Sequence, residues 1–216
     1  MDPVLENLGL FASGFLRSLG IAAWALLGSL VWGTVLAVFR ISPVPVLRAF
    51  GTFYVTWLRN TPLAIVLFTM AFGIPAVGIN ASYYVFGVTG LVLYTSAFVC
   101  EAVRSGVATV PAGQAEAARS IGLTFSQTLG LIVLPQALRA VVPPVGNVLI
   151  AMIKNSAVVG AMGVGGELFS VYNRLTSAQG YPALPVLTGV AIGFLIMTLT
   201  ASALLALFER RAAVVR

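Results

Sequence analysis

The chain has 216 residues, of which 59% are hydrophobic and only 8% are charged, and its mean hydropathy is +1.02. Because a soluble domain is about one quarter charged, these values exclude an ordinary soluble protein and predict a membrane domain with about five or six spans of ~20 residues. The net charge of +6 comes from single cations beside apolar runs, which predicts topology signals and contacts with anionic lipid rather than nucleic acid. With no histidine and one cysteine, the sequence excludes histidine-based catalysis, histidine metal sites and disulfides within the chain.

The first predicted span is the uncharged run Leu19–Phe39. Residues 1–18 before it are expected to form an interfacial lead-in and no cleaved leader, since they carry no basic n-region. Ser29 and Gly33 have the small-xxx-small spacing that lets helices approach closely. The segment Pro43–Pro45 predicts a loop after the span.

The second predicted span is interrupted by a proline. It combines the aromatic-rich segment Phe50–Leu58 with the apolar run Leu63–Ile74, and Arg59-Asn60-Thr61-Pro62 separates the two. Proline lacks a backbone N–H and frees nearby carbonyls. Because irregular backbone at membrane depth is tolerated only where protein covers it or where it lines a cavity, we expect the break in such a place. A loop is predicted over Pro75–Phe86.

Three further apolar runs are long enough to cross a bilayer, namely Gly87–Val103, Val145–Met162 and Val186–Phe208. The third span ends at Glu101 and Arg104, one helical turn apart, which predicts an intrahelical ion pair. Cys100 beside them is expected to be a buried free thiol. Gly163, Gly165 and Gly166 are expected to break the fourth span, and residues 167–185 are expected to be a polar, turn-rich connection.

The cations predict an orientation. With five spans and a loop between the third and fourth, two arginines fall on one side, Arg17 and Arg174. Eight fall on the side of that loop: Arg40, Arg48, Arg104, Arg119, Arg139, Arg210, Arg211 and Arg216. Because cytoplasmic loops carry the excess of lysine and arginine, we expect the loop and the C-terminus in the cytoplasm and the N-terminus outside.

The longest polar window is Pro111–Ala137, between the third and fourth spans. The proline that opens it suits the first turn of a helix. The window predicts a short helix, a break at Gly122, and a second helix opened by a capping box of Thr124 and Gln127. Pro135 is expected to end or kink that second helix.

Three groups of residues in this window carry a resemblance to a known family: Glu116-Ala117-Ala118, Gly122, and Ile132-Val133-Leu134-Pro135. Together they resemble the EAA loop of ABC-importer permeases. Further residues make the chain similar to the polar-amino-acid uptake branch, over roughly residues 13 to 208 and closest to actinobacterial glutamate-uptake permeases: Gln114, Gln136-Ala137, Arg59-Asn60-Thr61-Pro62-Leu63 and Lys154-Asn155-Ser156.

The resemblance implies an all-α polytopic membrane protein with the type I ABC-importer permease fold, about five transmembrane helices and a cytoplasmic coupling helix, in one permease domain over residues 1–216. It implies a bacterial plasma-membrane location and four partners: an ATPase dimer, a second permease subunit (identical or related), an extracytoplasmic substrate-binding protein and the lipid bilayer. The chain lacks the Gly-x-x-x-x-Gly-Lys-Ser/Thr run that cradles ATP phosphates. We therefore expect no enzyme activity, metal or cofactor of its own, and ATP-Mg on the partner ATPase.

The ATPase-coupling residues implied by the resemblance are Gln114, Glu116, Ala117, Ala118 and Gly122. An alternative for Glu116 is a solvated helix charge paired with Arg119 or Ser120. Gly122 either turns through positive φ, or lets a partner approach closely, or is an ordinary loop glycine.

The predicted substrate-binding residues are Lys154, Asn155, Ser156, Arg59 and Thr61. An intramembrane cation costs at least ~2.5 kcal/mol at the bilayer centre, so Lys154 should face a cavity or a partner. Lys154 and Arg59 could instead snorkel to an interface. Two cations without a carboxylate at comparable depth favour an acidic amino acid, glutamate or aspartate, with glutamine as the alternative. A self-sufficient secondary transporter is the alternative class, although intramembrane acids and an internal repeat are missing.

Overall fold

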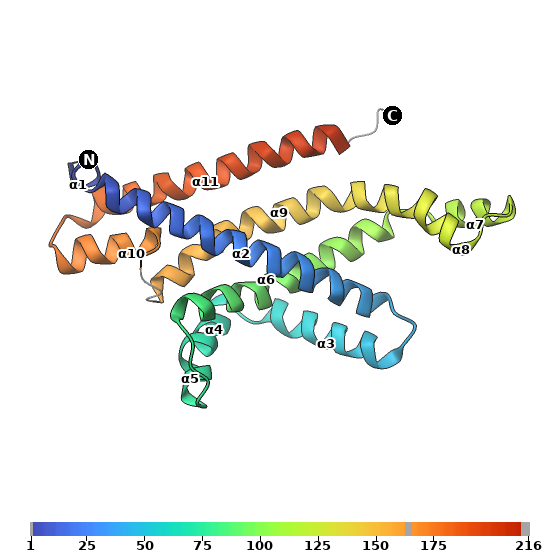
Figure 1. Ribbon diagram of the computed structural model, residues 1–216, viewed down its shortest axis with the longest axis horizontal. Coiled ribbons are helices and arrows are strands. Elements are labelled where there is room, and N and C mark those ends of the chain that lie inside the picture. The colour runs from blue at the N-terminus through green and yellow to red at the C-terminus, as the bar shows by residue number, and fades with distance from the viewer. Residues whose placement is uncertain (1, 163–165, 213–216) are drawn as a thin grey trace.

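The computed structural model describes residues 2–162 and 166–212, and every regular element within these ranges is helical (Figure 1). The elements in chain order are α1 Asp2–Glu6, α2 Leu8–Ile41, α3 Pro45–Asn60, α4 Leu63–Phe68, η1 Thr69–Gly73, α5 Ile74–Ala76, α6 Tyr83–Ala108, α7 Ala112–Ser120, α8 Phe125–Gln127, η2 Thr128–Val133, α9 Leu134–Ala161, α10 Leu168–Asn173, η3 Arg174–Ala178 and α11 Ala183–Ala212, where η marks a π-helical segment.

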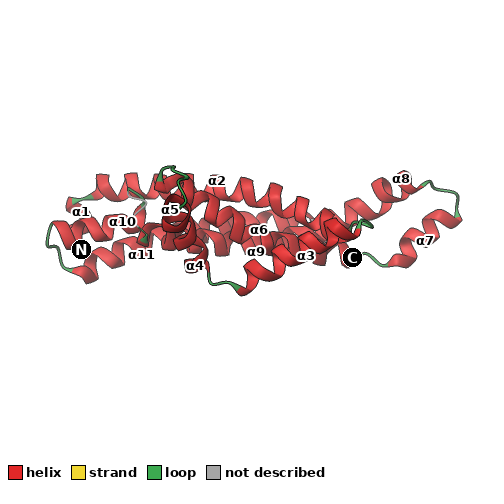
Figure 2. Cartoon of the chain, turned by 90° about the horizontal axis from the view of Figure 1, so that it is seen from below, coloured by secondary structure: helices red, strands yellow, loops and turns green. Residues whose placement is uncertain are grey.

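The number of spans agrees with the prediction. Four helices are long and apolar enough to cross a membrane: Leu8–Ile41, Tyr83–Ala108, Phe125–Ala161 and Ala183–Arg210. A fifth span results if Pro45–Asn60 and Leu63–Ala76, which meet at 105°, are counted as one broken span. The long helices lie along one axis, with α1 at one end and the α7–α8 hairpin at the other (Figures 1 and 2).

Helix α2 is the longest regular element of the first half and contains the predicted first span. It begins at Leu8, so most of the expected lead-in is helical instead. The reason is packing, since Gly14 lets α2 lie against α10: a Cβ there would be 2.9 Å from Cγ2 of Val171. Gly33 packs equally closely on α6, where a Cβ would be 2.6 Å from Cβ of Val99. Ser29 is fully buried on the same face, as its small-residue spacing predicts.

The predicted break in the second span is confirmed. Helix α3 ends at Asn60, and Thr61 is extended with ψ 132°, the conformation favoured before a proline. The chain then turns, α4 packs on α6 through the buried side chain of Leu67, and α5 projects away from the bundle (Figure 1). The loop predicted around Pro43–Pro45 is shorter than expected, because Pro45 opens α3 at its first turn. The loop predicted at Pro75–Phe86 is likewise shorter, since Ser82 caps α6 by accepting from the Val85 N–H.

Pro135 does not end the helix, which was one of the two outcomes predicted for it, and Pro143 and Pro144 do not end it either. The chain is helical from Phe125 to Ala161, with a π-helical turn before Pro135. Pro135 follows almost directly on the π-helical turn Thr128–Val133, inside this continuous helix. Pro143 and Pro144 lie inside α9. The helix therefore tolerates two lost backbone hydrogen bonds within a membrane-length segment.

The connection predicted over residues 167–185 is partly helical instead of turn-rich. Leu168, Val171 and Leu175 are buried on one side of α10 and η3, which orders the segment. The Glu167 carboxylate is buried, and it caps α10 by accepting from the N–H groups of Phe169 and Ser170. Helix α9 ends at Ala161, while the predicted breakers Gly163 and Gly165 lie outside the described residues.

Candidate functional site

The coupling hairpin, residues 111–137, is built by local sequence signals. Pro111 is the N-cap of α7, with ψ 133°, one position before the predicted first turn. Gly122 has φ +91°, and a Cβ there would have no heavy atom within 4 Å. The backbone conformation, not space, therefore requires glycine. The capping box is confirmed, since Thr124 accepts from the Gln127 N–H and the Gln127 side chain accepts from the Thr124 N–H.

A hydrogen bond between side chains closes the hairpin at its base. Gln136 donates from Nε2 to Oε1 of Gln114 and to the carbonyl of Ile132, 2.7 Å away. Gln114 therefore points towards the start of α9. Ala118 is also buried against the hairpin. Two of the predicted coupling residues thus make contacts within the chain.

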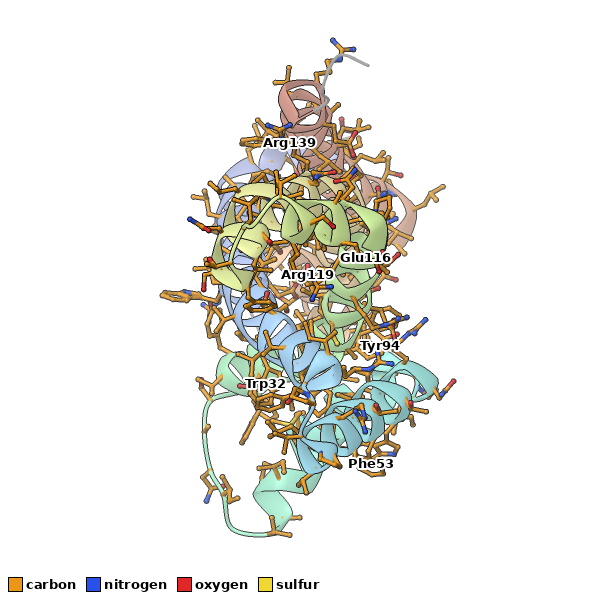
Figure 3. The ribbon with its side chains drawn as sticks, turned by 90° about the vertical axis from the view of Figure 1, so that its right-hand side faces the viewer. Trp32, Phe53, Tyr94, Glu116, Arg119 and Arg139 are labelled. Atoms are coloured by element: carbon orange, nitrogen blue, oxygen red, sulfur yellow. The ribbon has the colours of Figure 1, made fainter. Side chains whose placement is uncertain are left out.

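Glu116 and Ala117 lie on the exposed side of the hairpin. Glu116 and Arg119 are on α7 at the end of the molecule that faces the viewer in Figure 3. The ion pairs formed within residues 2–162 and 166–210 all meet at Glu101, so the alternative of a Glu116–Arg119 pair is not observed there. Large apolar side chains are exposed beside them, namely Ile121, Phe125 and Leu131. An exposed carboxylate beside exposed apolar groups is a surface typical of protein docking.

The predicted substrate residues of α9 point in three directions, because successive residues of a helix are about 100° apart. Asn155 lines a cavity of about 130 Å³ between α6 and α9. Ser156 is buried and its hydroxyl donates to the carbonyl of Ile153, 2.7 Å away. Lys154 is exposed on the outer surface of the chain. Only Asn155 of the three is presented to the cavity.

The cavity also contains a buried hydroxyl that the sequence did not single out. Thr95 is 2% exposed and lines the cavity. Its Oγ1 has no hydrogen-bond partner within the described part of the chain. A buried hydroxyl without a partner is costly, and here it lies beside Asn155. The remaining lining residues are Tyr94, Phe98, Val148, Ala151 and Met152.

Arg59 contacts one of the residues that line this cavity. Its Cζ is 5.7 Å from the centroid of the Phe98 ring, and Phe98 lines the cavity. Thr61 does not join it, since its hydroxyl donates to the carbonyl of Trp57, 2.9 Å away. Phe98 therefore contacts Arg59 and lines the cavity together with Asn155, whereas Lys154 does not line it.

Glu101 forms a cluster that sequence reasoning only partly identified. The predicted pair with Arg104 is confirmed, with Nη2 3.0 Å from Oε2. Arg40 donates to Oε1 from α2, and Arg59 Nη1 lies 3.3 Å from the same oxygen. The one local signal was the i,i+3 spacing to Arg104, whereas Arg40 is 61 residues away. Cys100, beside Glu101, is a buried free thiol as predicted.

Comparisons with known proteins support a transport role. A family model described as "Binding-protein-dependent transport system inner membrane component" matches residues 29–214. The chain is 37% identical over 208 residues to the probable glutamine ABC transporter permease protein GlnM of Bacillus subtilis, covering 96% of this chain and 95% of that protein. It is 39% identical over 197 residues to the glutamate transport system permease protein GluC of Corynebacterium efficiens, covering 86% of each.

The chain is also similar to chains in solved structures of ABC transporters. A chain in the crystal structure of an amino acid ABC transporter with histidines matches with a TM-score of 0.91 and 32% identity, over 97% of both chains. A chain of the inward-facing MetNI methionine ABC transporter matches with a TM-score of 0.77 at 22% identity, over 99% of this chain and 100% of that one, which is evidence for the fold alone.

Proposed function

The chain belongs to the inner membrane components of binding-protein-dependent transport systems, and we propose that, as the permease of an ABC importer for polar amino acids, it moves glutamate into the cytoplasm. It is an integral protein of the plasma membrane and not the ATPase. Permeases of this family work with an ATPase and a binding protein. The family assignment decides against the alternative of a self-sufficient secondary transporter.

The observation that carries the choice of glutamate is the cavity between α6 and α9. It offers the Asn155 amide and the unpartnered Thr95 hydroxyl, and Arg59 lies over the ring of Phe98, one of its lining residues. Such groups can hydrogen-bond an amino acid and place a guanidinium near a carboxylate. One relative named above is a glutamate permease, which agrees with this choice.

Glutamine is the second candidate. The relative from Bacillus subtilis is named a probable glutamine permease, and Asn155 can pair with an amide as well as with a carboxylate. The experiment is reconstitution of the permease with its ATPase and binding protein in proteoliposomes, followed by uptake of acidic, neutral and basic amino acids. Uptake of glutamate above glutamine and arginine is expected, and uptake of glutamine alone would replace glutamate by the second candidate.

Within this proposal the coupling hairpin docks on an ATPase dimer that holds ATP-Mg. Glu116 contacts the ATPase through its free carboxylate, and Ala117 and the exposed apolar groups surround that contact. Gln114, Ala118 and Gly122 maintain the shape of the hairpin. Glu116→Lys should leave the protein inserted but separate ATP hydrolysis from uptake, while Arg119→Gln on the same helix should have a smaller effect.

Three of the predicted substrate residues need a different account. Lys154 is exposed on the outer surface of the chain, so it would reach substrate only at a surface shared with a second permease subunit, identical or related. Ser156 and Thr61 use their hydroxyls within their own helices, which makes them supports of the site. Lys154→Met should lower glutamate uptake if the two subunits enclose the path together.

A further inference from the structure

We propose that Glu101 is a resident counter-ion that the side-chain carboxylate of an acidic substrate displaces from Arg59, so that Arg59 provides the preference for acidic over neutral amino acids and its contact with Glu101 limits that preference. This inference rests on the proposed transport of glutamate through the cavity between α6 and α9. It assigns a specificity-determining role to Glu101, which was expected only to pair with Arg104.

The two oxygens of Glu101 are shared unequally among three arginines. Oε2 accepts both Nε and Nη2 of Arg104, at 3.1 and 3.0 Å. Oε1 accepts a hydrogen bond from Arg40. Arg59 approaches the same Oε1 at 3.3 Å. One carboxylate thus faces three guanidinium groups, so the cluster has an excess of positive charge.

Arg59 is the arginine held least firmly by Glu101. Its side chain is 45% exposed, whereas that of Arg40 is 16% exposed and hydrogen-bonded. Arg104 is as exposed as Arg59 but is held by two hydrogen bonds. Release of Arg59 leaves Glu101 paired with both other arginines. The exchange therefore avoids an unpaired charge, which is the main cost of breaking an ion pair away from water.

Arg59 also contacts a residue that lines the cavity. Its guanidinium lies over the ring of Phe98, and that ring lines the cavity with Asn155. The cation–π contact can hold the guanidinium near Phe98 while its donors turn from Glu101 to a ligand. The carboxylate of an acidic substrate replaces the negative charge of Glu101 beside Arg59, but a neutral amide does not. Glutamine would therefore leave Arg59 on Glu101.

The test uses the permease–ATPase complex in nanodiscs and measures binding of labelled glutamate and glutamine, together with their uptake in proteoliposomes. Arg59→Gln should weaken glutamate binding about fivefold and change glutamine binding by less than about twofold. Glu101→Gln keeps the size of the side chain and frees Arg59, so glutamate binding should tighten relative to glutamine. Arg104→Gln is the matched control, because it also removes an arginine from Glu101, and it should leave the glutamate-to-glutamine ratio unchanged.

If Arg59→Gln weakens binding of glutamate and glutamine equally, the inference is overturned. It is also overturned if Arg104→Gln changes the glutamate-to-glutamine ratio as much as Arg59→Gln does. If Glu101→Gln fails to insert, Arg59→Gln and Arg59→Lys decide the matter alone, since both keep the pairs of Glu101 with Arg40 and Arg104. A wild-type protein that does not transport glutamate would instead contradict the proposed function. A wild-type protein that imports glutamate, with a ratio insensitive to Arg59, would contradict only this inference.

Discussion

Gln136, in the first turn of α9, donates a hydrogen bond from Nε2 to Oε1 of Gln114 in α7. The bond joins α7 to the helix that carries Asn155. We therefore expect a displacement of α7 to act directly on the start of α9.

Loss of this hydrogen bond should uncouple the hairpin from α9. Gln114→Ala and Gln136→Ala should each reduce uptake per ATP hydrolysed, while the double variant should be no worse than the poorer single variant, because both changes remove the same bond. Insertion should be normal, since Gln114 is exposed and Gln136 is only partly buried. ATPase activity and uptake measured together in proteoliposomes check this. Gln179→Ala, at an exposed glutamine in another connection, is the control. Strictly additive losses of uptake per ATP in the double variant would argue against a shared role of Gln114 and Gln136.

Gly122 provides a separate prediction about backbone conformation. Gly122→Ala should destabilise the hairpin by about 1–2 kcal/mol, because its φ of +91° is unfavourable for a residue with a Cβ. Gly113→Ala is a matched control: a Cβ there also meets nothing within 4 Å, but its φ is not positive. That substitution should be neutral or slightly stabilising because alanine favours helix. Amide hydrogen exchange over residues 112–127 measures local unfolding in both variants. Equal protection in Gly122→Ala and Gly113→Ala would show that the positive φ of Gly122 causes no strain in the alanine variant.

Local features were predictable from sequence, and the position of each feature in space was not. The capping box and the turn at Gly122 depend on neighbours in the chain, so their spacing was enough. The orientation of Lys154 and Asn155 was not predictable, because an apolar span gives no clear indication of which helical face meets the cavity. Long-range contacts were missed for a related reason: Arg40 reaches Glu101 across 61 residues, and a single sequence gives no signal for that pairing.

Glu167 predicts a pH dependence of stability. Burial raises the pKa of its carboxyl, against the opposing effects of the N–H groups of Phe169 and Ser170 and the charge of Arg17. A carboxyl with a raised pKa in the folded state stabilises the fold while it is protonated, and that contribution is lost as pH rises from the ordinary carboxyl pKa through the raised value.

The variant Glu167→Gln should therefore flatten the dependence of melting temperature on pH across that window. Glu116→Gln, at an exposed carboxylate of the coupling hairpin, should keep the slope of the wild-type protein. Thermal unfolding in detergent at a series of pH values measures both. The same slope in Glu167→Gln and in the wild-type protein would mean that Glu167 does not titrate with folding.

The orientation proposed from the arginines can be tested with single cysteines in a Cys100→Ala background, which removes the one native thiol. Asn80 and Ser177 are exposed in connections that the arginine count places outside, and Ser126 is exposed on the coupling hairpin. A membrane-impermeant maleimide added to intact cells should label Asn80→Cys and Ser177→Cys, and should label Ser126→Cys only after the membrane is opened. Labelling of Ser126→Cys in intact cells would reverse the orientation.

Thr95 provides the sharpest test of the cavity, because its hydroxyl is buried, lines the cavity and has no partner in residues 2–162 and 166–210. Thr95→Val keeps the shape of the side chain and removes that hydroxyl. The variant should be as stable as the wild-type protein or more stable by about 1 kcal/mol, because an unsatisfied buried group is lost. It should nevertheless bind glutamate less tightly if the hydroxyl serves the ligand.

The neighbouring residue supplies the opposite control. Ser96 is also buried in α6, but its hydroxyl donates to the carbonyl of Leu93 and lies 3.1 Å from the hydroxyl of Tyr54. Ser96→Ala should therefore lower the melting temperature and leave glutamate affinity unchanged in the folded fraction. Melting temperature and binding of labelled glutamate, measured on the same nanodisc preparations, distinguish a hydroxyl used for folding from one used for the ligand. Unchanged glutamate affinity in Thr95→Val would show that the cavity between α6 and α9 does not bind the substrate through Thr95.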